Sequence, residues 1–566
     1  MKILSLHCDY IKFKPLKKAL KQLDELTEKQ KEEVKVEEPL VIMTAIEKQD
    51  QSNPNILQEL TKEITEIAKQ VNAKNIVLYP YAHLSPSLSN PAFAQKTLEQ
   101  ADKELSKKFK VTRAPFGYYK EFELKVKGHP LSELSRDLKF TGELKGEQSD
   151  ESDNYKQLLR ELSKTKLDAR KLKDNDHRIL GQRMDLFSFS ETAPGMVFWH
   201  NNGLIIKNKL IDFWREEHKK AGYQEISTPQ ILDKKLWQIS GHWDKYKENI
   251  FLSDYEKRTF AVKPMNCPGG MLIYKATPKS YKDLPLRTGE LGIVHRQELS
   301  GVLAGLFRVI QFTQDDAHIY CTEKQLEQEI INIIELTDKF YKIFKFDYHV
   351  ELSTRPKKRI GSDKIWDKAE SILESVLKKK KIKFKLNKGD GAFYGPKIDF
   401  HIKDSLNRTW QTATIQLDFA MPERFDLTYQ DKDNKSKRPV MLHRTIFGSL
   451  ERFIGILLEH TSGHLPTWLA PIQVRVINFT DRNNKACKQL HNELTNQNIR
   501  VDLDLSSEPL GGKIKQAEME KIPYIITIGD REEREGNLAI RHKGKITQIN
   551  KEDFQKQIKE EIERKA

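Results

Sequence analysis

Cysteine is scarce in this sequence, which has four in 566 residues: Cys8, Cys267, Cys321 and Cys487. None of them forms a Cys-x-x-Cys pair. Such wide spacing excludes a disulfide framework and a ribbon-type zinc site. We therefore expect the protein in a reducing compartment, the cytoplasm.

Long hydrophobic runs are also missing. No stretch of about 18 uncharged apolar residues, the length that a membrane-spanning helix requires, occurs in the sequence. Near the N-terminus, Asp9 and Lys12 interrupt any apolar core of a secretion signal. The mean hydropathy of −0.66, with 32% charged and 38% hydrophobic residues, is typical of a soluble globular protein. We expect neither secretion nor a membrane as a partner.

Two nucleotide-binding fingerprints are absent: the phosphate loop G-x-x-x-x-G-K-[ST] and the strand-linked dinucleotide motif. If the protein uses ATP, it must hold the nucleotide by other means. The charge balance points to a polyanionic partner, because 97 Lys and Arg against 82 Asp and Glu leave a net charge of +15. This excess favours nucleic acid through contacts with phosphates. A basic surface that only keeps the protein soluble would give the same net charge.

The length predicts a modular protein of about four folding units. Strand and helix patterns alternate at both ends of the chain, aromatic residues and glycine concentrate in the middle, and a polar, charged stretch precedes that middle segment. We expect four regions: a small α/β domain (1–145), a linker or helical region (146–192), a large sheet-based catalytic domain (193–468) and a second α/β module (469–566).

Three arginines offer an alternative way to hold a nucleotide. Arg296 and Arg308 lie near Phe312, and far downstream Arg452 stands at the start of a helical pattern. Guanidinium groups on separate elements could clamp a bent triphosphate by bidentate contacts, while Phe312 stacks on the base. A single arginine more often forms an ion pair at the protein surface. Three arginines in this order are a specific signal for a nucleotide site.

Longer motifs support this interpretation. They are VKPMNCPGG at 262–270, GIVHRQELSGVLAGLFRVIQFTQDDAHIYCT at 292–322, AFYGPKID at 392–399, WQTATIQLDF at 410–419, and the segment 440–458. In this order they resemble the class II core of the threonyl-tRNA synthetase family, and the resemblance extends from about His177 to the end of the chain. Arg296 and Glu298 fall in the second class II signature and Arg452 in the third. Residues 222–229 are similar to the first, which in the family lies at the dimer interface.

The resemblance implies the fold and the reaction. We expect an α/β and α+β multidomain protein with a class II antiparallel-sheet catalytic core. It would attach L-threonine to tRNA(Thr) through a threonyl-adenylate, with ATP and Mg²⁺, as a homodimer. Arg296 and Arg452 would be catalytic. The implied ATP-binding residues are Arg296, Glu298, Arg308, Phe312, Gln411 and Arg452.

The same resemblance implies one zinc ion per subunit, held by Cys267, His318 and His443. The spacing of these residues alone matches no local zinc pattern, and without the family they would pass for a buried thiol and ordinary histidines. One thiolate and two imidazoles suit zinc and leave a fourth position open. Asp316 and His318 would face the same side of an extended strand. The implied threonine-binding residues are Met265, Gln314, Asp316, Tyr394, Lys397 and Gln416.

A zinc that reads an amino group and a hydroxyl would reject valine but admit serine, which lacks only a methyl worth about 1–3 kcal/mol. Such an enzyme needs a second site that hydrolyses seryl-tRNA(Thr) after transfer. Residues 1–145 resemble the N-terminal editing domain of archaeal threonyl-tRNA synthetases, which is related to D-aminoacyl-tRNA deacylases. The residues that match are His83, Tyr119, Lys120 and Glu133.

The last region resembles the class IIa anticodon-binding domain, with Lys515, Glu532 and Arg541 at its base-contacting positions. Glu532 can accept a hydrogen bond from cytosine and Arg541 can donate two to guanine. Lys515 stands where bacterial relatives have arginine, and a lysine cannot make the same bidentate contact.

Two other readings compete with a threonine ligase. A class II synthetase for proline or serine is disfavoured by the triad of Cys267, His318 and His443. A synthetase-like RNA-binding regulator that has lost catalysis would be expected to lack Arg296, Arg452 or a zinc ligand, and all of them are present.

Overall fold

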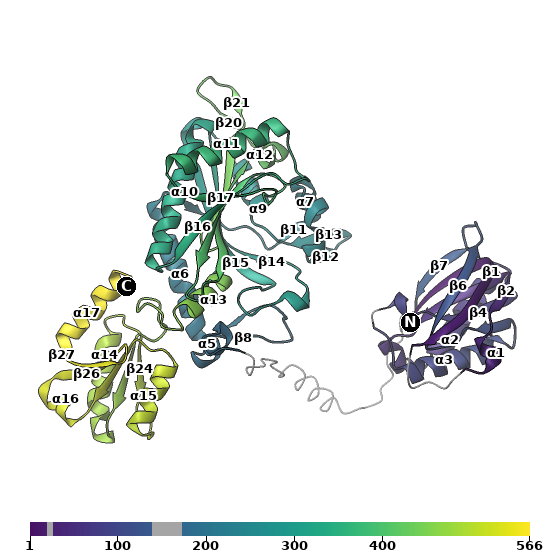
Figure 1. Cartoon of the computed structure of the whole chain (residues 1–566), viewed down its shortest axis with the longest axis horizontal. Helices are drawn as coiled ribbons and strands as arrows, with labels where there is room; N and C mark the ends of the chain where they lie inside the picture. The colour runs from purple at the N-terminus through teal and green to yellow at the C-terminus, as the bar shows by residue number, and fades with distance from the viewer. Residues whose placement is uncertain (20–25, 86, 139–171, 566) are drawn as a thin grey trace. The chain divides into compact units, whose positions relative to one another are not determined.

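The computed structural model describes residues 1–19, 26–85, 87–138 and 172–565 (Figure 1). Contacts divide the chain into two units, Met1–Glu151 and Ser152–Ala566. Most of the region expected to be a linker, including its acidic run at 146–153, lies outside the described residues. Within the described part of the chain, every helix is too short or too polar to cross a membrane.

The first unit is built on a seven-stranded mixed sheet. Its strand order is β2-β1-β3-β4-β5, and β6 and β7 also pair with β1. The strands are β1 (Lys2–Lys18), β2 (Val34–Glu37), β3 (Pro39–Ala45), β4 (Asn75–Pro80), β5 (Lys110–Arg113), β6 (Tyr118–Val126) and β7 (Glu133–Asp137). The helices are α1 (Glu28–Lys31), α2 (Ile56–Gln70) and α3 (Pro91–Leu105), with short 3-10 turns η1 (Lys48–Ser52) and η2 (Ala82–Leu84).

Two helices close one face of this sheet. In α2, Ile56, Leu60, Ile64 and Ile67 recur at helical spacing and are all buried. The α3 helix begins where the Asn90 side chain accepts a hydrogen bond from the backbone of Ala92. Both helices pack on the apolar residues of β3 and β4. A second cluster, around Phe13 and Tyr79, fills the space on the other side of the sheet. The first unit therefore has its own core, which confirms the expected small α/β domain.

The second unit contains an eight-stranded, largely antiparallel sheet. Its strand order is β10-β14-β15-β22-β19-β18-β16-β17, and the outermost pairs β10–β14 and β16–β17 are parallel. The strands are β10 (Gln224–Glu225), β14 (Leu286–His295), β15 (Gln311–Cys321), β16 (Asp347–Ser353), β17 (Phe384–Asn387), β18 (Lys397–Lys403), β19 (Thr409–Asp418) and β22 (Val440–Thr445). This sheet is the antiparallel core that the motifs predict.

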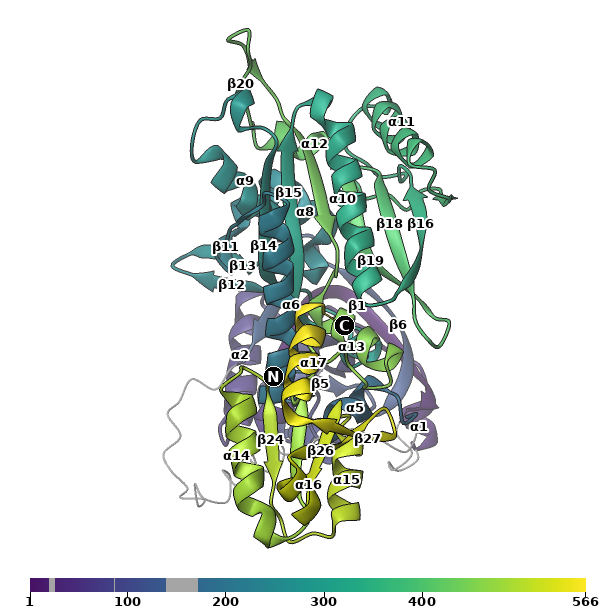
Figure 2. The same ribbon diagram turned by 90° about the vertical axis from the view of Figure 1, so that its left-hand side faces the viewer.

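Four long helices bury one face of the eight-stranded sheet: α6 (Asn201–Lys220), α10 (Glu323–Ile343), α11 (Asp363–Lys379) and α13 (Leu450–His460). Along α10 the residues at 326, 330, 333, 337 and 340 are buried at helical spacing. The α10 helix runs along the strands in Figure 2. Side chains alternate along a strand, so the residues that lie between those of the apolar face point to the opposite face of the sheet. That opposite face carries the polar site described below.

Shorter elements surround the sheet. The helices and turns are α5 (His177–Arg183), α7 (Lys234–Ser240), α8 (His242–Tyr246), η4 (Lys247–Asn249), α9 (Cys267–Lys275), η5 (Tyr281–Asp283), η6 (Ser300–Val302) and α12 (Ala420–Arg424). The strands are β8 (Phe187–Ser188), β9 (Phe198–Trp199), β11 (Ile231–Asp233), β12 (Leu252–Tyr255), β13 (Arg258–Val262), β20 (Tyr429–Gln430) and β21 (Ser436–Lys437). Of these, α5, α7, α8 and α9 contribute side chains to the site described below.

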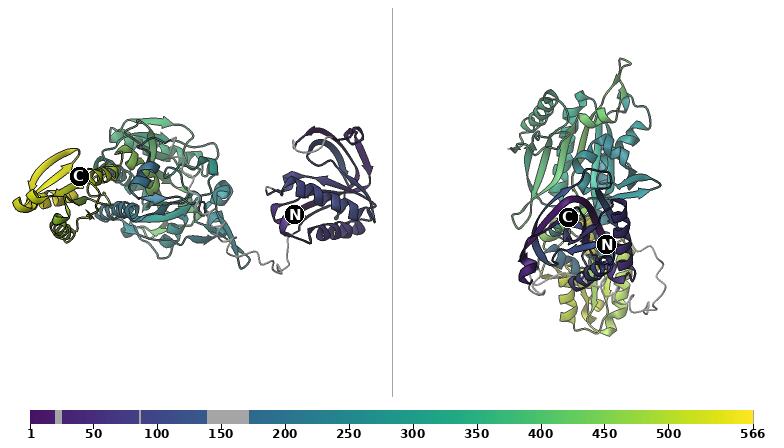
Figure 3. Two further views of the ribbon diagram at one scale, coloured as in Figure 1. Left: turned by 90° about the horizontal axis from the view of Figure 1, so that it is seen from below. Right: turned by 90° about the vertical axis from the view of Figure 1, so that its right-hand side faces the viewer.

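The C-terminal module is a five-stranded sheet with strand order β24-β23-β25-β26-β27. Helices α14 and α17 pack on one face and α15 on the other, and Figure 3 shows this module in yellow. The expected strand–helix–strand order is thereby confirmed. The strands are β23 (Val474–Asn478), β24 (Val501–Asp504), β25 (Tyr524–Ile528), β26 (Asn537–His542) and β27 (Lys545–Asn550). The helices are η7 (Asp481–Asn483), α14 (Asn484–Thr495), α15 (Leu510–Met519), α16 (Asp530–Glu535) and α17 (Lys551–Glu563).

The separate cores predict separate unfolding. Leu60→Ala removes a fully buried side chain from the core of the first unit, so it should lower the free energy of unfolding of that unit by about 2–5 kcal/mol. Calorimetry of the full chain should show the first unit's transition moving to lower temperature while the second stays in place. The exposed Lys62→Ala on the same helix is the control. A shift of both transitions by Leu60→Ala would contradict independent cores.

Candidate active site

The candidate site lies on the polar face of the eight-stranded sheet. Phe312, Gln314, Asp316 and His318 alternate along β15 with residues of the apolar face, so all four lie on one side of the strand. In the neighbouring strand β22, His443 is paired with His318. The next strand, β19, places Gln416 opposite His443. The extended strand predicted for Asp316 and His318 is confirmed.

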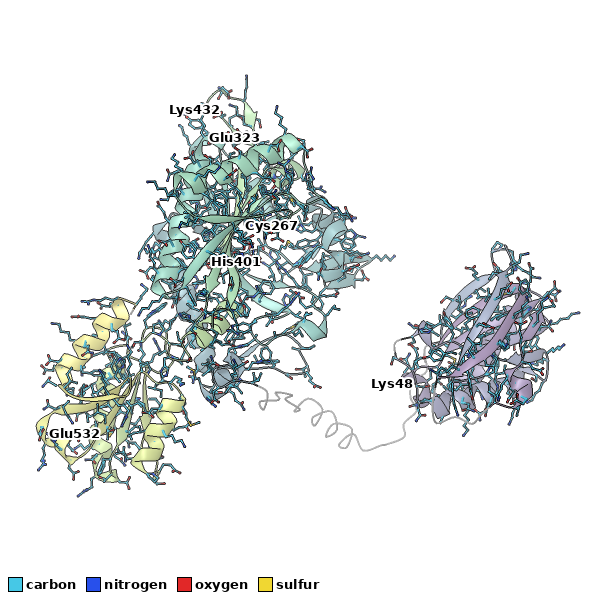
Figure 4. The ribbon with its side chains drawn as sticks, in the orientation of Figure 1. Lys48, Cys267, Glu323, His401, Lys432 and Glu532 are labelled. Atoms are coloured by element: carbon cyan, nitrogen blue, oxygen red, sulfur yellow. The ribbon has the colours of Figure 1, made fainter. Side chains whose placement is uncertain are left out.

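Three potential metal ligands meet at this row. Cys267, the first residue of α9, approaches the sheet, and its sulfur and one ring nitrogen each of His318 and His443 lie within 4.8 Å of one another. The two imidazole rings are 5.0 Å apart at 89°. All three residues are buried, and Figure 4 labels Cys267 inside the larger unit. The fold thus assembles a donor set from three segments that are distant in sequence.

The donor chemistry of this cluster fits zinc. Asp418 Oδ2 lies 2.9 Å from Nε2 of His443, and Asp418 also accepts hydrogen bonds from two backbone amides at 420 and 421. A carboxylate held in this way orients the imidazole and leaves its Nδ1 lone pair for a metal. Nε2 of His318 is buried and has no hydrogen-bond partner among the described residues. Both histidines can therefore act as neutral ligands.

Burial sets the protonation of two residues of the triad, His318 and Cys267. It lowers the pKa of His318 well below its usual value, so the imidazole is neutral at physiological pH. It raises the pKa of the Cys267 thiol. Binding of a metal by Cys267 at neutral pH must therefore displace the thiol proton.

Asp316 is the acidic group beside the triad. Its Oδ2 lies 3.7 Å from Nε2 of His318 and accepts a hydrogen bond of 3.3 Å from the Asn266 side chain. Burial raises the pKa of Asp316 to about 7. A bound ammonium group would favour the ionised carboxylate, so this position suits the amino group of an amino acid.

Other residues expected to bind threonine surround this point. The Tyr394 ring lies 5.3 Å from that of His443, and Gln416 donates a hydrogen bond to the carbonyl of Gly395. Lys397 is paired with Gln416 in the sheet. Met265 packs with the apolar residues around Cys267.

A cavity of about 240 Å³ adjoins this pocket. It is lined by Gln314 and by the six residues expected to bind ATP: Arg296, Glu298, Arg308, Phe312, Gln411 and Arg452. Three arginines face one carboxylate there. Burial, together with the positive charges of Arg308 and Arg296, lowers the pKa of Arg452. An anion in this cavity would reverse that repulsion, so the charges favour a polyphosphate.

Each arginine already has a partner in the protein. The Arg296 guanidinium lies over the Phe312 ring at 5.1 Å, and Arg308 pairs with Glu298 at 2.9 Å. Nε of Arg452 donates a 2.8 Å hydrogen bond to the carbonyl of Phe307. That last bond fixes the guanidinium through the backbone and leaves its remaining N–H groups for a ligand.

His242, which belongs to none of the sequence motifs, lies next to this pocket. It is fully buried, and its ring contacts those of Phe393 and Tyr394. Its Nδ1 is bonded to Ser240, while its Nε2 has no partner among the described residues. Burial lowers its pKa to about 3. No spacing pattern in the sequence marks this residue.

The first unit has a cavity of its own, of about 610 Å³. His83, Tyr119 and Lys120 line it, but Glu133, which lies on β7, does not. Lys120 Nζ donates hydrogen bonds to the carbonyls of Pro115 and Tyr118. Burial lowers the pKa of Lys120 to about 8.

The residues expected to read the anticodon are spread over the C-terminal module. Lys515 is exposed on α15. Arg541, on β26, forms an ion pair of 3.5 Å with Glu518, which also lies on α15. Glu532, labelled in Figure 4, lies on α16 and accepts a hydrogen bond from the backbone of Gly529. Arg541 and Glu532 line different cavities. Lys515 and Arg541 thus lie near each other, and Glu532 lies apart.

Three family models match the chain. They are the "Archaea-specific editing domain of threonyl-tRNA synthetase" over residues 1–138, the "tRNA synthetase class II core domain (G, H, P, S and T)" over 246–461, and the "Anticodon binding domain" over 473–561. The expected fold class is confirmed.

Similar proteins point the same way. The chain is 54% identical over 396 residues to the threonine--tRNA ligase of Caldanaerobacter subterraneus subsp. tengcongensis, covering 70% of this chain and 62% of that protein. It is 52% identical over 418 residues to that of Clostridium botulinum strain Okra, covering 74% and 64%. The chain thus spans less than two thirds of the length of these curated relatives.

Two solved structures share the fold. One is described as the RNA binding domain of threonyl-tRNA synthetase from Cryptosporidium parvum Iowa II, with a TM-score of 0.66, 39% identity, and coverage of 68% of this chain and 98% of that chain. The other is a putative threonyl-tRNA synthetase from Aeropyrum pernix, with a TM-score of 0.62, 28% identity, and coverage of 69% and 97%.

The triad predicts one bound zinc per chain. His443→Ala removes a ligand, so the purified variant should contain less than about a tenth of the zinc of the unaltered protein. Elemental analysis after dialysis against a weak chelator measures this. His349→Ala, on the same sheet but outside the triad, is the control and should keep its zinc. Full zinc in the His443→Ala protein would rule out this site.

Proposed function

The chain belongs to the threonyl-tRNA synthetase family, and we propose that it uses ATP to join L-threonine to tRNA(Thr) in the cytoplasm through a threonyl-adenylate. The observation that carries the proposal is the row of side chains along β15. It runs from the arginine-lined cavity at Phe312 to the Cys/His/His triad at His318. A nucleotide site and an amino-acid site on one strand suit a reaction that joins the two.

In the activation step, the threonine carboxylate attacks the α-phosphate of ATP and pyrophosphate leaves. Arg296 and Arg452 stabilise the negative charge that grows on the phosphoryl oxygens, since both line the cavity. Arg308 holds the outgoing phosphates and Phe312 the adenine. Mg²⁺ accompanies ATP and neutralises part of the phosphate charge. None of these side chains forms a covalent bond to the substrate.

Threonine would be recognised beside the triad. Zinc held by Cys267, His318 and His443 would supply a Lewis acid with a position open for the amino and hydroxyl groups. Asp316 accepts a hydrogen bond from the ammonium or the hydroxyl. Valine has no hydroxyl and would leave buried polar groups unpaired, whereas serine keeps both donors and loses only a methyl. The synthetic site therefore rejects valine and admits serine.

Hydrolysis of seryl-tRNA(Thr) falls to the first unit in this proposal. The match of residues 1–138 to the editing-domain model supports this role, as does the cavity lined by His83, Tyr119 and Lys120. The ammonium of Lys120 would hold the terminal nucleotide of the tRNA while a positioned water attacks the ester. Glu133 could take part only by acting from outside that cavity.

The remaining parts of the proposal concern partners. Lys515, Glu532 and Arg541 would contact the anticodon of tRNA(Thr), in the module matched by the anticodon-binding model. Two copies of the chain would form a homodimer through residues 222–229.

The activity is tested by pyrophosphate exchange into ATP with each amino acid in turn. Threonine should stimulate exchange strongly, serine weakly, and valine and proline not at all. Stimulation by proline alone would favour the rival synthetase. No exchange with any amino acid, from a protein that still binds tRNA, would favour a regulator that has lost catalysis.

Arg452→Ala should reduce the kcat of threonine-dependent exchange by about 10²–10³-fold, because it removes a donor aimed at the developing charge. The zinc content should not change. Arg438→Ala removes an arginine that is bonded to Pro422 outside the cavity, and it should leave kcat within about twofold. Equal losses in both variants would mean that Arg452 has no special role.

Loss of the first unit should separate editing from synthesis. A fragment of residues 172–566 should charge tRNA(Thr) with threonine but also accumulate seryl-tRNA(Thr), which the full chain hydrolyses. If preformed seryl-tRNA(Thr) were hydrolysed at the same rate by both proteins, the first unit would not be the editing site.

Lys120 gives this activity a pH dependence. Its pKa is near 8, so the ammonium is present below pH 8 and lost above it. The ratio of deacylation rates between the unaltered protein and Lys120→Ala should fall as the pH rises from 7 to 9. The rate of ester hydrolysis without protein is subtracted at each pH before the ratio is taken, because alkaline hydrolysis adds to both rates. Lys125→Ala, an exposed neighbour on β6 paired with Asp9, should show no such trend.

A further inference from the structure

A buried histidine outside the matched class II core contacts a turn that lines the proposed nucleotide cavity. His177 is the first residue of α5 and is 1% exposed, whereas the class II core model begins at residue 246. Its Nε2 accepts a 2.9 Å hydrogen bond from the backbone amide of Leu306. Its ring lies 4.2 Å from that of Phe307.

The turn that His177 contacts also holds Arg452. Residues 304–308 are closed by the bonds Ala304 N to Arg308 O and Phe307 N to Ala304 O. The Phe307 carbonyl accepts the hydrogen bond from Arg452, and Phe307 lines the nucleotide cavity. A displacement of this turn would therefore move the acceptor that orients the arginine.

The fit between the turn and the imidazole is close. Gly305 has a φ of +54°, and a Cβ at this position would lie 2.2 Å from Nε2 of His177. The backbone can approach the ring only because residue 305 has no side chain. Residue 177 and the turn thus form one packed unit.

The hydrogen bonds specify one tautomer. Because the Leu306 amide donates to Nε2, the proton of the neutral ring must be on Nδ1. Nδ1 lies 2.7 Å from Oε1 of Glu459, which also accepts a bond from the His177 backbone. Glu459 lies on α13, the helix that carries Arg452. His177 therefore joins α13 to the turn by one donor and one acceptor.

The same groups do not form a second metal site. Asp176, His177 and Glu459 offer ligand atoms within 4.8 Å of one another. However, both ring nitrogens are occupied by the bonds above. Asp176 caps α5 and pairs with Arg178, and the second oxygen of Glu459 pairs with Arg408. His177 therefore has no unpartnered ring nitrogen to offer an ion.

We propose that His177 is a positioning residue for adenylate formation, which sets the place of the Arg452 guanidinium through the 304–308 turn. The inference rests on the proposed use of Arg452 with ATP. It makes α5, at the end of the region expected to be a linker, a part of the catalytic apparatus. This role requires both hydrogen bonds of the ring: the one that Nδ1–H donates to Glu459 and the one that Nε2 accepts from the Leu306 amide.

Two substitutions separate these bonds. His177→Asn keeps a donor near Nδ1 for Glu459 but cannot reach Leu306, whereas His177→Gln can place an oxygen near Nε2. His177→Asn should lower kcat/KM for ATP by at least about tenfold, since small misplacements of catalytic groups have large effects. His177→Gln should recover part of that loss. KM for threonine should stay unchanged in both.

A double-mutant cycle shows whether His177 acts through Arg452. In an Arg452→Ala background, His177→Asn should cause little further loss, because the group that it positions is gone. Ile333→Ala, in the core on α10, is the control: it should lower the unfolding temperature but leave kcat/KM for ATP unchanged. Independent, multiplying losses from His177→Asn and Arg452→Ala would overturn the proposal.

Calorimetric titration with ATP alone separates this proposal from the proposed function. Weaker ATP binding by His177→Asn than by the unaltered protein supports the positioning role, even if threonine were not the amino acid used. Equal affinities with equal exchange rates would refute the positioning role and leave the threonine ligase intact. Absence of threonine-dependent exchange in the unaltered protein would count against the proposed function only.

Discussion

One face of strand β15 sets the distances between the side chains of the candidate site. Two-residue alternation places Phe312, Gln314, Asp316 and His318 in a row, at about 6.6 Å per step. The register with β22 sets His443 opposite His318. A slip of one residue would turn the entire row into the apolar core against α10 and α13, and the buried hydrophobic residues of β15 would oppose it. The hydrophobic face therefore fixes the chemistry of the polar face.

The opposite face of the same strand positions the third arginine. Asp315 is fully buried and accepts hydrogen bonds from the backbone amides of Ile446, Phe447 and Gly448. These amides form the turn between β22 and α13, so the carboxylate anchors the start of the helix that carries Arg452. From the other side, His177 holds the 304–308 turn. The repulsion among the arginines is thus opposed by a rigid scaffold, and a phosphate chain can supply the missing negative charge.

The sequence predicted the features that leave a local pattern, either the alternation of a strand or a family motif. The strand around Asp316 and His318 and the α/β modules at both ends follow from local periodicity. The six residues that family motifs predict to bind the nucleotide meet in one cavity. What the sequence could not supply was the contribution of distant or isolated groups. The role of His177 cannot be read from the sequence, because its partners, Leu306 and Glu459, are more than 100 residues away. His242 belongs to no spacing pattern, and only burial beside Tyr394 marks it. Glu133 matched by sequence but lies on a strand that does not line the first-unit cavity.

The central claim is that one site unites the metal triad and the arginine cavity. Calorimetric titration of a non-hydrolysable threonyl-adenylate analogue, into zinc-loaded and zinc-free protein, tests it most directly. If the claim is correct, the analogue should bind the zinc-loaded protein at least about 100-fold more tightly than threonine or ATP alone, because one molecule gains from both halves of the site. Removal of zinc should abolish most of this gain. An affinity that is the same with and without zinc, or no tighter than that of ATP, would contradict a single joined site.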